Sequence, residues 1–233
     1  MCFENYPLII NPDKSHIACL FLIDSSGAMN GEILNDTLKA LNTFREEIKN
    51  NKSVCEVLDV AVVEFNSTAH VIQEFVPVEY MEPVYLTVGG TSVLNYGLRI
   101  AIDKILERHR VYRRLSTLPY VPYLVVITDD GFPDSPVKDI AEEIRELEKK
   151  DILRLFVMGT KGSRMESLRD LGLGNRILLL DEHILSNMFD GVLMGMGGSH
   201  YYEIDKDGNK YLRERKQIGQ DLPHEVVGSE DWL

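Results

Sequence analysis

The chain has 233 residues, of which 44% are hydrophobic and 27% charged, a balance that is ordinary for a domain that builds its own core. Its length fits one large α/β domain better than two small ones. The formal net charge of −12 argues against a general nucleic-acid-binding protein, because phosphate contacts need clustered Lys and Arg.

Short apolar runs alternate with helical patterns along residues 16–197. The first run, His16–Ile23, is almost continuously apolar, which is typical of a central strand covered on both faces. It stops at Asp24, and an amphipathic helical pattern follows. Two runs separated by only two residues, Val57–Phe65 and Thr68–Phe75, then predict a tight antiparallel hairpin.

Helical patterns separate three later apolar runs. These runs predict the remaining strands, Tyr123–Thr128, Ile152–Met158 and Ile177–Leu180. Strands that alternate with helices imply a three-layer α/β/α sandwich around a mainly parallel six-stranded sheet. The early hairpin contributes one antiparallel edge strand. We expect this domain to span residues 16–197, after an N-terminal segment of residues 1–15.

Residues 198–233 differ from the rest of the chain, since they are polar and acidic at their end. Within them, Asp207-Gly208 stands between two short runs with strand character and predicts a β-hairpin. We therefore assign these residues to a C-terminal extension.

The N-terminus lacks the basic start and long apolar core of a signal peptide. No apolar run reaches the roughly 20 residues that a membrane-spanning helix requires. The three cysteines are widely spaced and show no C-x-x-C pattern. We expect a cytoplasmic protein with no membrane partner, and a core position for Cys19 within its apolar run.

Polar residues follow several of the predicted strands. Ligands of α/β sheets bind beyond the carboxyl ends of the strands, so Asp24, Thr91 and Asp129 should gather at one end of the domain. A carboxylate followed by a hydroxyl two residues later, as in Asp24 and Ser26, can present hard oxygens to one small cation. Mg²⁺ keeps some of its waters, which leaves positions that an incoming carboxylate can complete.

The DSSGA segment that begins at Asp24 resembles the metal-binding loop of the von Willebrand factor A family, an Asp-x-Ser-x-Ser sequence joined by a distant Thr and Asp. Asp24 and Ser26 match the first two positions, and Thr91, within Gly-Gly-Thr, looks like the threonine. The distal aspartate is Asp129 in an alignment on the preceding threonine, or Asp130 in an alignment on the Asp-Gly pair. The resemblance covers about residues 16 to 197.

Ala28 departs from the family pattern, because it stands where the second serine belongs. Water could take the place of the missing hydroxyl, but the affinity for metal should fall. The resemblance implies a non-catalytic protein-interaction module that holds Mg²⁺ or Mn²⁺ and takes an Asp or Glu of its protein partner as the last ligand. A metal-free interaction scaffold with a degenerate site is the alternative.

Within the family, three short motifs are similar to a bacterial tellurite-resistance-associated subgroup: MNGE after the loop, GGT, and DGFPD. Members of that subgroup are cytoplasmic proteins encoded beside a kinase and a phosphatase. The resemblance therefore implies a role in stress or tellurite-resistance-type signalling, with a nearby kinase or phosphatase as partner.

A phosphatase of the aspartyl-phosphate type would also begin with an aspartate after the first buried strand. Such enzymes usually place a second aspartate two residues later, where this chain has Ser26. Neither a G-x-x-x-x-G-K-[ST] phosphate loop nor a G-x-S-x-G nucleophile elbow occurs. We expect no enzymatic activity.

Two further patterns are expected to have no chemical role. A basic cluster follows a helical pattern and predicts a solvated helix end; it consists of Arg108, Arg110, Arg113 and Arg114. The six histidines lack metal-ligand spacing, so we expect them at the surface or at helix ends.

Overall fold

The computed structural model describes residues 9–117, 119–129, 137–163, 176–189, 200–204 and 210–214. The chain divides into two compact units, residues 1–186 and 187–233. The domain boundary that we expect between residues 197 and 198 stays a prediction.

A six-stranded sheet with the strand order β3-β2-β1-β4-β5-β6 forms the centre of the first unit. All neighbouring strands pair in parallel except β2 and β3, which are antiparallel and leave β3 at the edge. This arrangement confirms the predicted sheet. Its strands are β1 (Ile17–Asp24), β2 (Leu58–Phe65), β3 (Ala69–Pro77), β4 (Tyr123–Thr128), β5 (Arg154–Gly159) and β6 (Ile177–Leu179).

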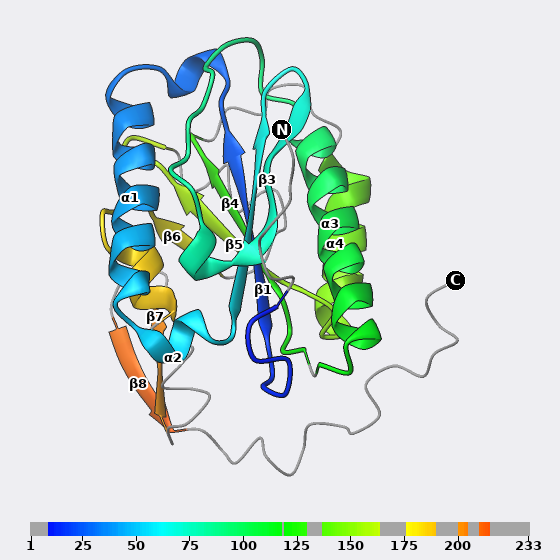
Figure 1. Cartoon of the computed structure of the whole chain (residues 1–233). Coiled ribbons are helices and arrows are strands. Elements are labelled where there is room, and N and C mark those ends of the chain that lie inside the picture. The colour runs from blue at the N-terminus through cyan, green and yellow to red at the C-terminus, as the bar shows by residue number, and fades with distance from the viewer. Residues whose placement is uncertain are drawn as a thin grey trace. The chain divides into compact units, whose positions relative to one another are not determined.

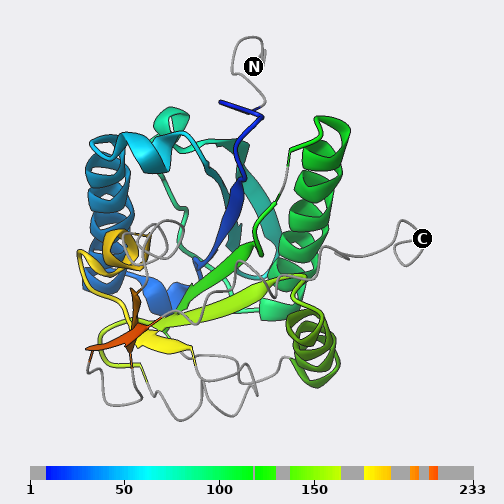
Figure 2. The same ribbon diagram turned by 90° about the horizontal axis from the view of Figure 1, so that it is seen from below.

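Helices cover both faces of this sheet, as Figures 1 and 2 show, with α1 on one side and α3 with α4 on the other. The predicted three-layer sandwich is therefore confirmed. None of the helices in the described ranges is long and apolar enough to cross a membrane. The labelled helical elements are α1 (Glu32–Lys49), α2 (Lys52–Cys55), α3 (Leu94–Arg114), α4 (Val137–Lys149) and the short 3₁₀ turns η1 (Gly27–Met29) and η2 (Val78–Tyr80). Residues 184–189 are also helical.

The core explains why the apolar runs become these strands. Every residue of β1 is buried, because β2 and β4 pair with its two edges and helices cover its two faces. Helix α3 lies very close to the sheet at Gly97, where an added Cβ would come within 2.8 Å of Leu22 Cδ1 and 2.9 Å of Phe65 Cβ. A glycine is therefore required at this contact.

The second unit contains the antiparallel pair β7 (His200–Ile204) and β8 (Lys210–Glu214). His200 pairs with Glu214 at one end of the ladder and Ile204 with Lys210 at the other. This pairing confirms the predicted C-terminal hairpin, and the predicted Asp-Gly turn lies outside the described residues.

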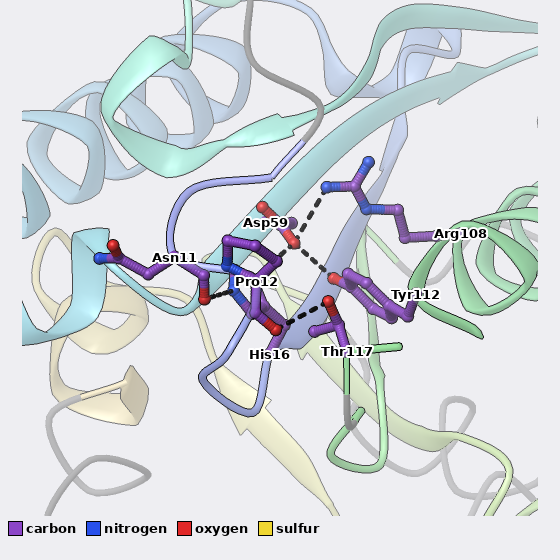
Figure 3. Close-up of polar contacts among 7 residues, drawn as sticks. All are labelled: Asn11, Pro12, His16, Asp59, Arg108, Tyr112 and Thr117. Carbon is purple, nitrogen blue, oxygen red and sulfur yellow. Dashed lines mark hydrogen bonds and ion pairs between the residues drawn. The ribbon is translucent and has the colours of Figure 1, made fainter. Parts of the chain in front are cut away.

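A buried polar cluster lies at the start of β1 and β2, and it corrects two predictions (Figure 3). Arg108 exposes only 4% of its surface and places its guanidinium 3.0 Å from Oδ2 of Asp59, so it is not part of a solvated helix end. His16 exposes 1% and places Nδ1 3.1 Å from the same oxygen, so it is not a surface histidine. Tyr112 donates its hydroxyl proton to that oxygen at 2.5 Å.

This cluster also fixes the chain before β1. His16 Nε2 lies 3.3 Å from the carbonyl oxygen of Asn11, and Thr117 donates its hydroxyl proton to the carbonyl of Pro12 at 3.0 Å (Figure 3). The segment that precedes the sheet is thus tied to the chain that follows α3.

Candidate functional site

Asp24 is the last residue of β1 and is fully buried at the carboxyl end of the sheet. Its Oδ1 accepts a hydrogen bond from the backbone N–H of Ser26 at 2.8 Å. Its Oδ2 accepts hydrogen bonds from the hydroxyls of Ser92 at 2.8 Å and Thr128 at 2.9 Å. One carboxylate therefore joins the loop after β1, the loop before α3 and the end of β4.

The ionisation of Asp24 reflects two opposing effects. Burial raises the pKa of its carboxyl group, and the hydrogen bonds from Ser26, Ser92 and Thr128 lower that pKa in part. A cation beside the carboxylate would favour the charged form, since an opposite charge within a few ångströms offsets the loss of water. The site is therefore suited to a positively charged ligand.

Backbone hydrogen bonds join the loop before α3 to the loop after β1. Gly27 donates its N–H to the carbonyl of Gly90 at 3.0 Å, and Gly89 donates its N–H to the carbonyl of Ser25 at 2.9 Å. Segments more than 60 residues apart in the sequence thus meet beside Asp24, as predicted from their positions at strand ends.

Thr91 lies in this loop, but its hydroxyl contacts a different residue. Its side chain is exposed, its Oγ1 lies 3.2 Å from Ser67 Oγ, and its backbone N–H donates to the same Ser67 oxygen at 3.0 Å. The hydroxyl that reaches Asp24 belongs to the next residue, Ser92, which the sequence pattern did not predict. The sequence signal that could have indicated Ser92 is its place directly after Thr91, since the two residues offer adjacent hydroxyls.

The remaining predicted site residues lie at the two strand ends. Ser26 exposes 3% and precedes η1 without capping it through its side chain, so a simple capping role does not account for this serine. Asp129 directly follows β4 and is partly exposed, whereas Asp130 lies outside the described residues. Thr128, which the sequence pattern also did not predict, makes the contact from β4 to Asp24. Ala28 is exposed within η1.

The model of the von Willebrand factor type A domain matches residues 19–188. The chain belongs to the von Willebrand factor type A family. A comparison with curated protein sequences gave no match.

Two solved structures share the fold. One is a von Willebrand factor type A protein from Catenulispora acidiphila, at 16% identity and a TM-score of 0.56, covering 80% of this chain and 43% of that one. Another is proximal thread matrix protein 1 from the mussel byssus with a zinc-occupied MIDAS motif, at 16% identity and a TM-score of 0.52, covering 78% of this chain and 46% of that one. This chain spans less than half the length of either protein.

The donor groups of this von Willebrand factor A site are suited to a hard divalent cation. They are the carboxylate of Asp24 and the hydroxyls of neighbouring Ser and Thr residues, and oxygen donors of this kind are the ligands of Mg²⁺. Within the described part of the chain, no group of three or more His, Cys, Asp or Glu could hold a metal ion. A metal site there would depend on Asp24 supported by hydroxyl groups.

Proposed function

We propose that this von Willebrand factor A domain is a non-catalytic protein-interaction module that holds Mg²⁺ or Mn²⁺ beside Asp24. The observation that carries the proposal is the buried Asp24 carboxylate, which three separate segments hold in place at the carboxyl end of the sheet. Asp24, Ser26 and Thr91, with Asp129 or Asp130 through water, would hold the cation. When bound, the cation supplies an open coordination position for an Asp or Glu of a partner protein.

The family supports this proposal, because the mussel relative has a zinc-occupied MIDAS motif in the same fold. Ala28 favours the alternative of a metal-free scaffold, since it removes one hydroxyl ligand. The chain's net charge of −12 also favours a partner that is basic around its carboxylate. The narrower proposal of tellurite-resistance-type signalling with a kinase or phosphatase partner is supported by the sequence motifs alone.

The groups around Asp24 also support the proposal of recognition without turnover. The side chains that donate hydrogen bonds to its carboxylate in the described segments are hydroxyls, those of Ser26, Ser92 and Thr128. Aspartyl-phosphate chemistry needs a second acid or base to move the proton, and neutral hydroxyls are poor at that task. Phosphate release from a generic phosphomonoester tests this proposal, and we expect none above the uncatalysed rate.

A melting experiment with added metal tests the binding proposal. We expect millimolar Mg²⁺ to raise the melting temperature only weakly. Ala28 lacks a hydroxyl ligand, which should raise the Kd for the metal, and stabilisation by a ligand grows with its concentration relative to Kd. Strong stabilisation at micromolar Mg²⁺ would show that Ala28 does not weaken the site. No shift with either Mg²⁺ or Mn²⁺ would favour the metal-free scaffold.

A further inference from the structure

Two exposed hydroxyls stand side by side where the β2–β3 turn meets the loop whose Ser92 contacts Asp24. Ser67, in the turn between β2 and β3, places its Oγ 3.2 Å from Thr91 Oγ1. Thr91 is the predicted threonine ligand, and both residues face solvent. Nothing in the sequence links Ser67 to the site, because it lies outside every segment of the family's metal-binding pattern.

The distance between these hydroxyls suits two neighbouring ligands of one cation. Mg²⁺ binds oxygens octahedrally at about 2.1 Å, so adjacent ligand oxygens lie about 3 Å apart. The distance of 3.2 Å between Ser67 Oγ and Thr91 Oγ1 is close to that separation. A cation could therefore contact both oxygens with little movement of either side chain.

The turn that carries Ser67 is fixed against the loop that carries Thr91. Asn66 accepts the backbone N–H of Val93 at 2.9 Å through its carbonyl, and its side-chain amide donates to Ser25 Oγ at 3.2 Å. Gly90 has φ +72°, and a Cβ there would lie 2.3 Å from Ser67 Oγ. The glycine before Thr91 thus leaves the space that Ser67 occupies.

We propose that Ser67 supplies the metal-ligating hydroxyl that Ala28 lacks. This inference rests on the proposed function, because it concerns the composition of that same metal site. The oxygen would come from the β2–β3 turn and not from the loop after β1. In this way the domain keeps its number of hydroxyl ligands although the Asp-x-Ser-x-Ser pattern is broken.

Calorimetric titration of Mg²⁺ and Mn²⁺ into the full chain tests the assignment with three variants and a control. Ser67→Ala should weaken metal binding by about 10-fold or more, in the range found when groups that support metal ligands are removed. Ser67→Ala combined with Ala28→Ser should recover most of the wild-type affinity, because the missing hydroxyl returns at the family position. Ala28→Ser alone should bind at least as tightly as wild type.

Thr68→Ala is the matched control, since Thr68 lies in the same exposed turn and its hydroxyl contacts Asn66 and His70, not the Thr91 loop. It should bind metal like wild type. Melting curves without metal show whether each variant folds.

Three outcomes would overturn the proposal. Wild-type affinity in Ser67→Ala would remove Ser67 from the site and leave the proposed function intact. Weak binding in Ser67→Ala that Ala28→Ser does not rescue would show that Ser67 only holds the loop. Absence of binding in the wild type at millimolar metal would overturn both this inference and the proposed metal function.

Discussion

Ser92 donates its hydroxyl proton to Oδ2 of Asp24 at 2.8 Å, although the two residues are 68 positions apart in the chain. Thr91, one residue earlier, directs its hydroxyl to Ser67 at the surface. Neighbouring hydroxyls of one loop therefore have different roles. The inner one fixes the buried carboxylate, and the outer one is available to solvent and to ligands.

Alanine substitutions separate these two roles. Ser92→Ala should lower the free energy of unfolding by about 1–2 kcal/mol, because it removes a hydrogen bond to a buried carboxylate. Thr91→Ala should change it by no more than about 0.5 kcal/mol, since its side chain is exposed. Chemical denaturation without metal measures both values, and equal costs would contradict the assignment of Ser92 as the inner contact.

Gly97 is expected to tolerate no side chain. Gly97→Ala should cost about 1–3 kcal/mol of stability, because its methyl group would press against Leu22 and Phe65. Gly89→Ala is the control, since an added Cβ there meets no atom within 4 Å and the backbone needs no positive φ. Denaturant midpoints compare the two variants, and a tolerated Gly97→Ala would mean that α3 can move away from the sheet.

The buried cluster around Asp59 predicts an unequal response to two substitutions. Asp59→Ala should cost about 3–5 kcal/mol, because it leaves the Arg108 guanidinium buried without its counter-charge. Tyr112→Phe removes one hydrogen bond to Asp59 and should cost about 1–2 kcal/mol. Similar small losses in both would show that water enters the cluster.

His109 predicts a loss of stability in mild acid. Burial, with the nearby charge of Arg113, lowers the pKa of His109 to about 4 from the ordinary 6.5. Between pH 6.5 and pH 4 the unfolded chain therefore binds more protons at His109 than the folded chain does. The free energy of unfolding falls as the pH drops through this range, by roughly 3 kcal/mol at most. His109→Phe keeps a ring beside Tyr112 and should reduce this dependence. Denaturation of both proteins from pH 7 to pH 4 measures the difference, and parallel curves would contradict the assignment.

The strands could be predicted because burial on both faces demands nearly continuous apolar runs. His16–Ile23 and Tyr123–Thr128 have that pattern, and the two-residue gap after Phe65 allows only a tight turn. The position of Asp24 could be predicted for the same reason, since the end of a buried strand fixes its place. Strand ends therefore account for the fold and for the position of the proposed site.

Contacts between distant side chains could not be predicted. Arg108 and His16 are charged or titratable residues whose burial depends on Asp59, 49 and 43 residues away in the chain. Ser67 lies in a turn whose sequence signals only a change of direction. Such pairs arise from tertiary packing, which leaves no periodic pattern in the sequence.

Calorimetric titration of Mg²⁺ and Mn²⁺ into the wild type and Asp24→Asn tests the central claim most directly. Asparagine keeps the size of the side chain, and because burial raises the pKa of Asp24, loss of its charge should not unfold the domain. We predict saturable binding to the wild type and at least about 100-fold weaker binding to the variant, since a central ligand matters at least as much as its supporting groups. Equal binding by both proteins, or no binding by either at millimolar metal, would contradict a metal site centred on Asp24.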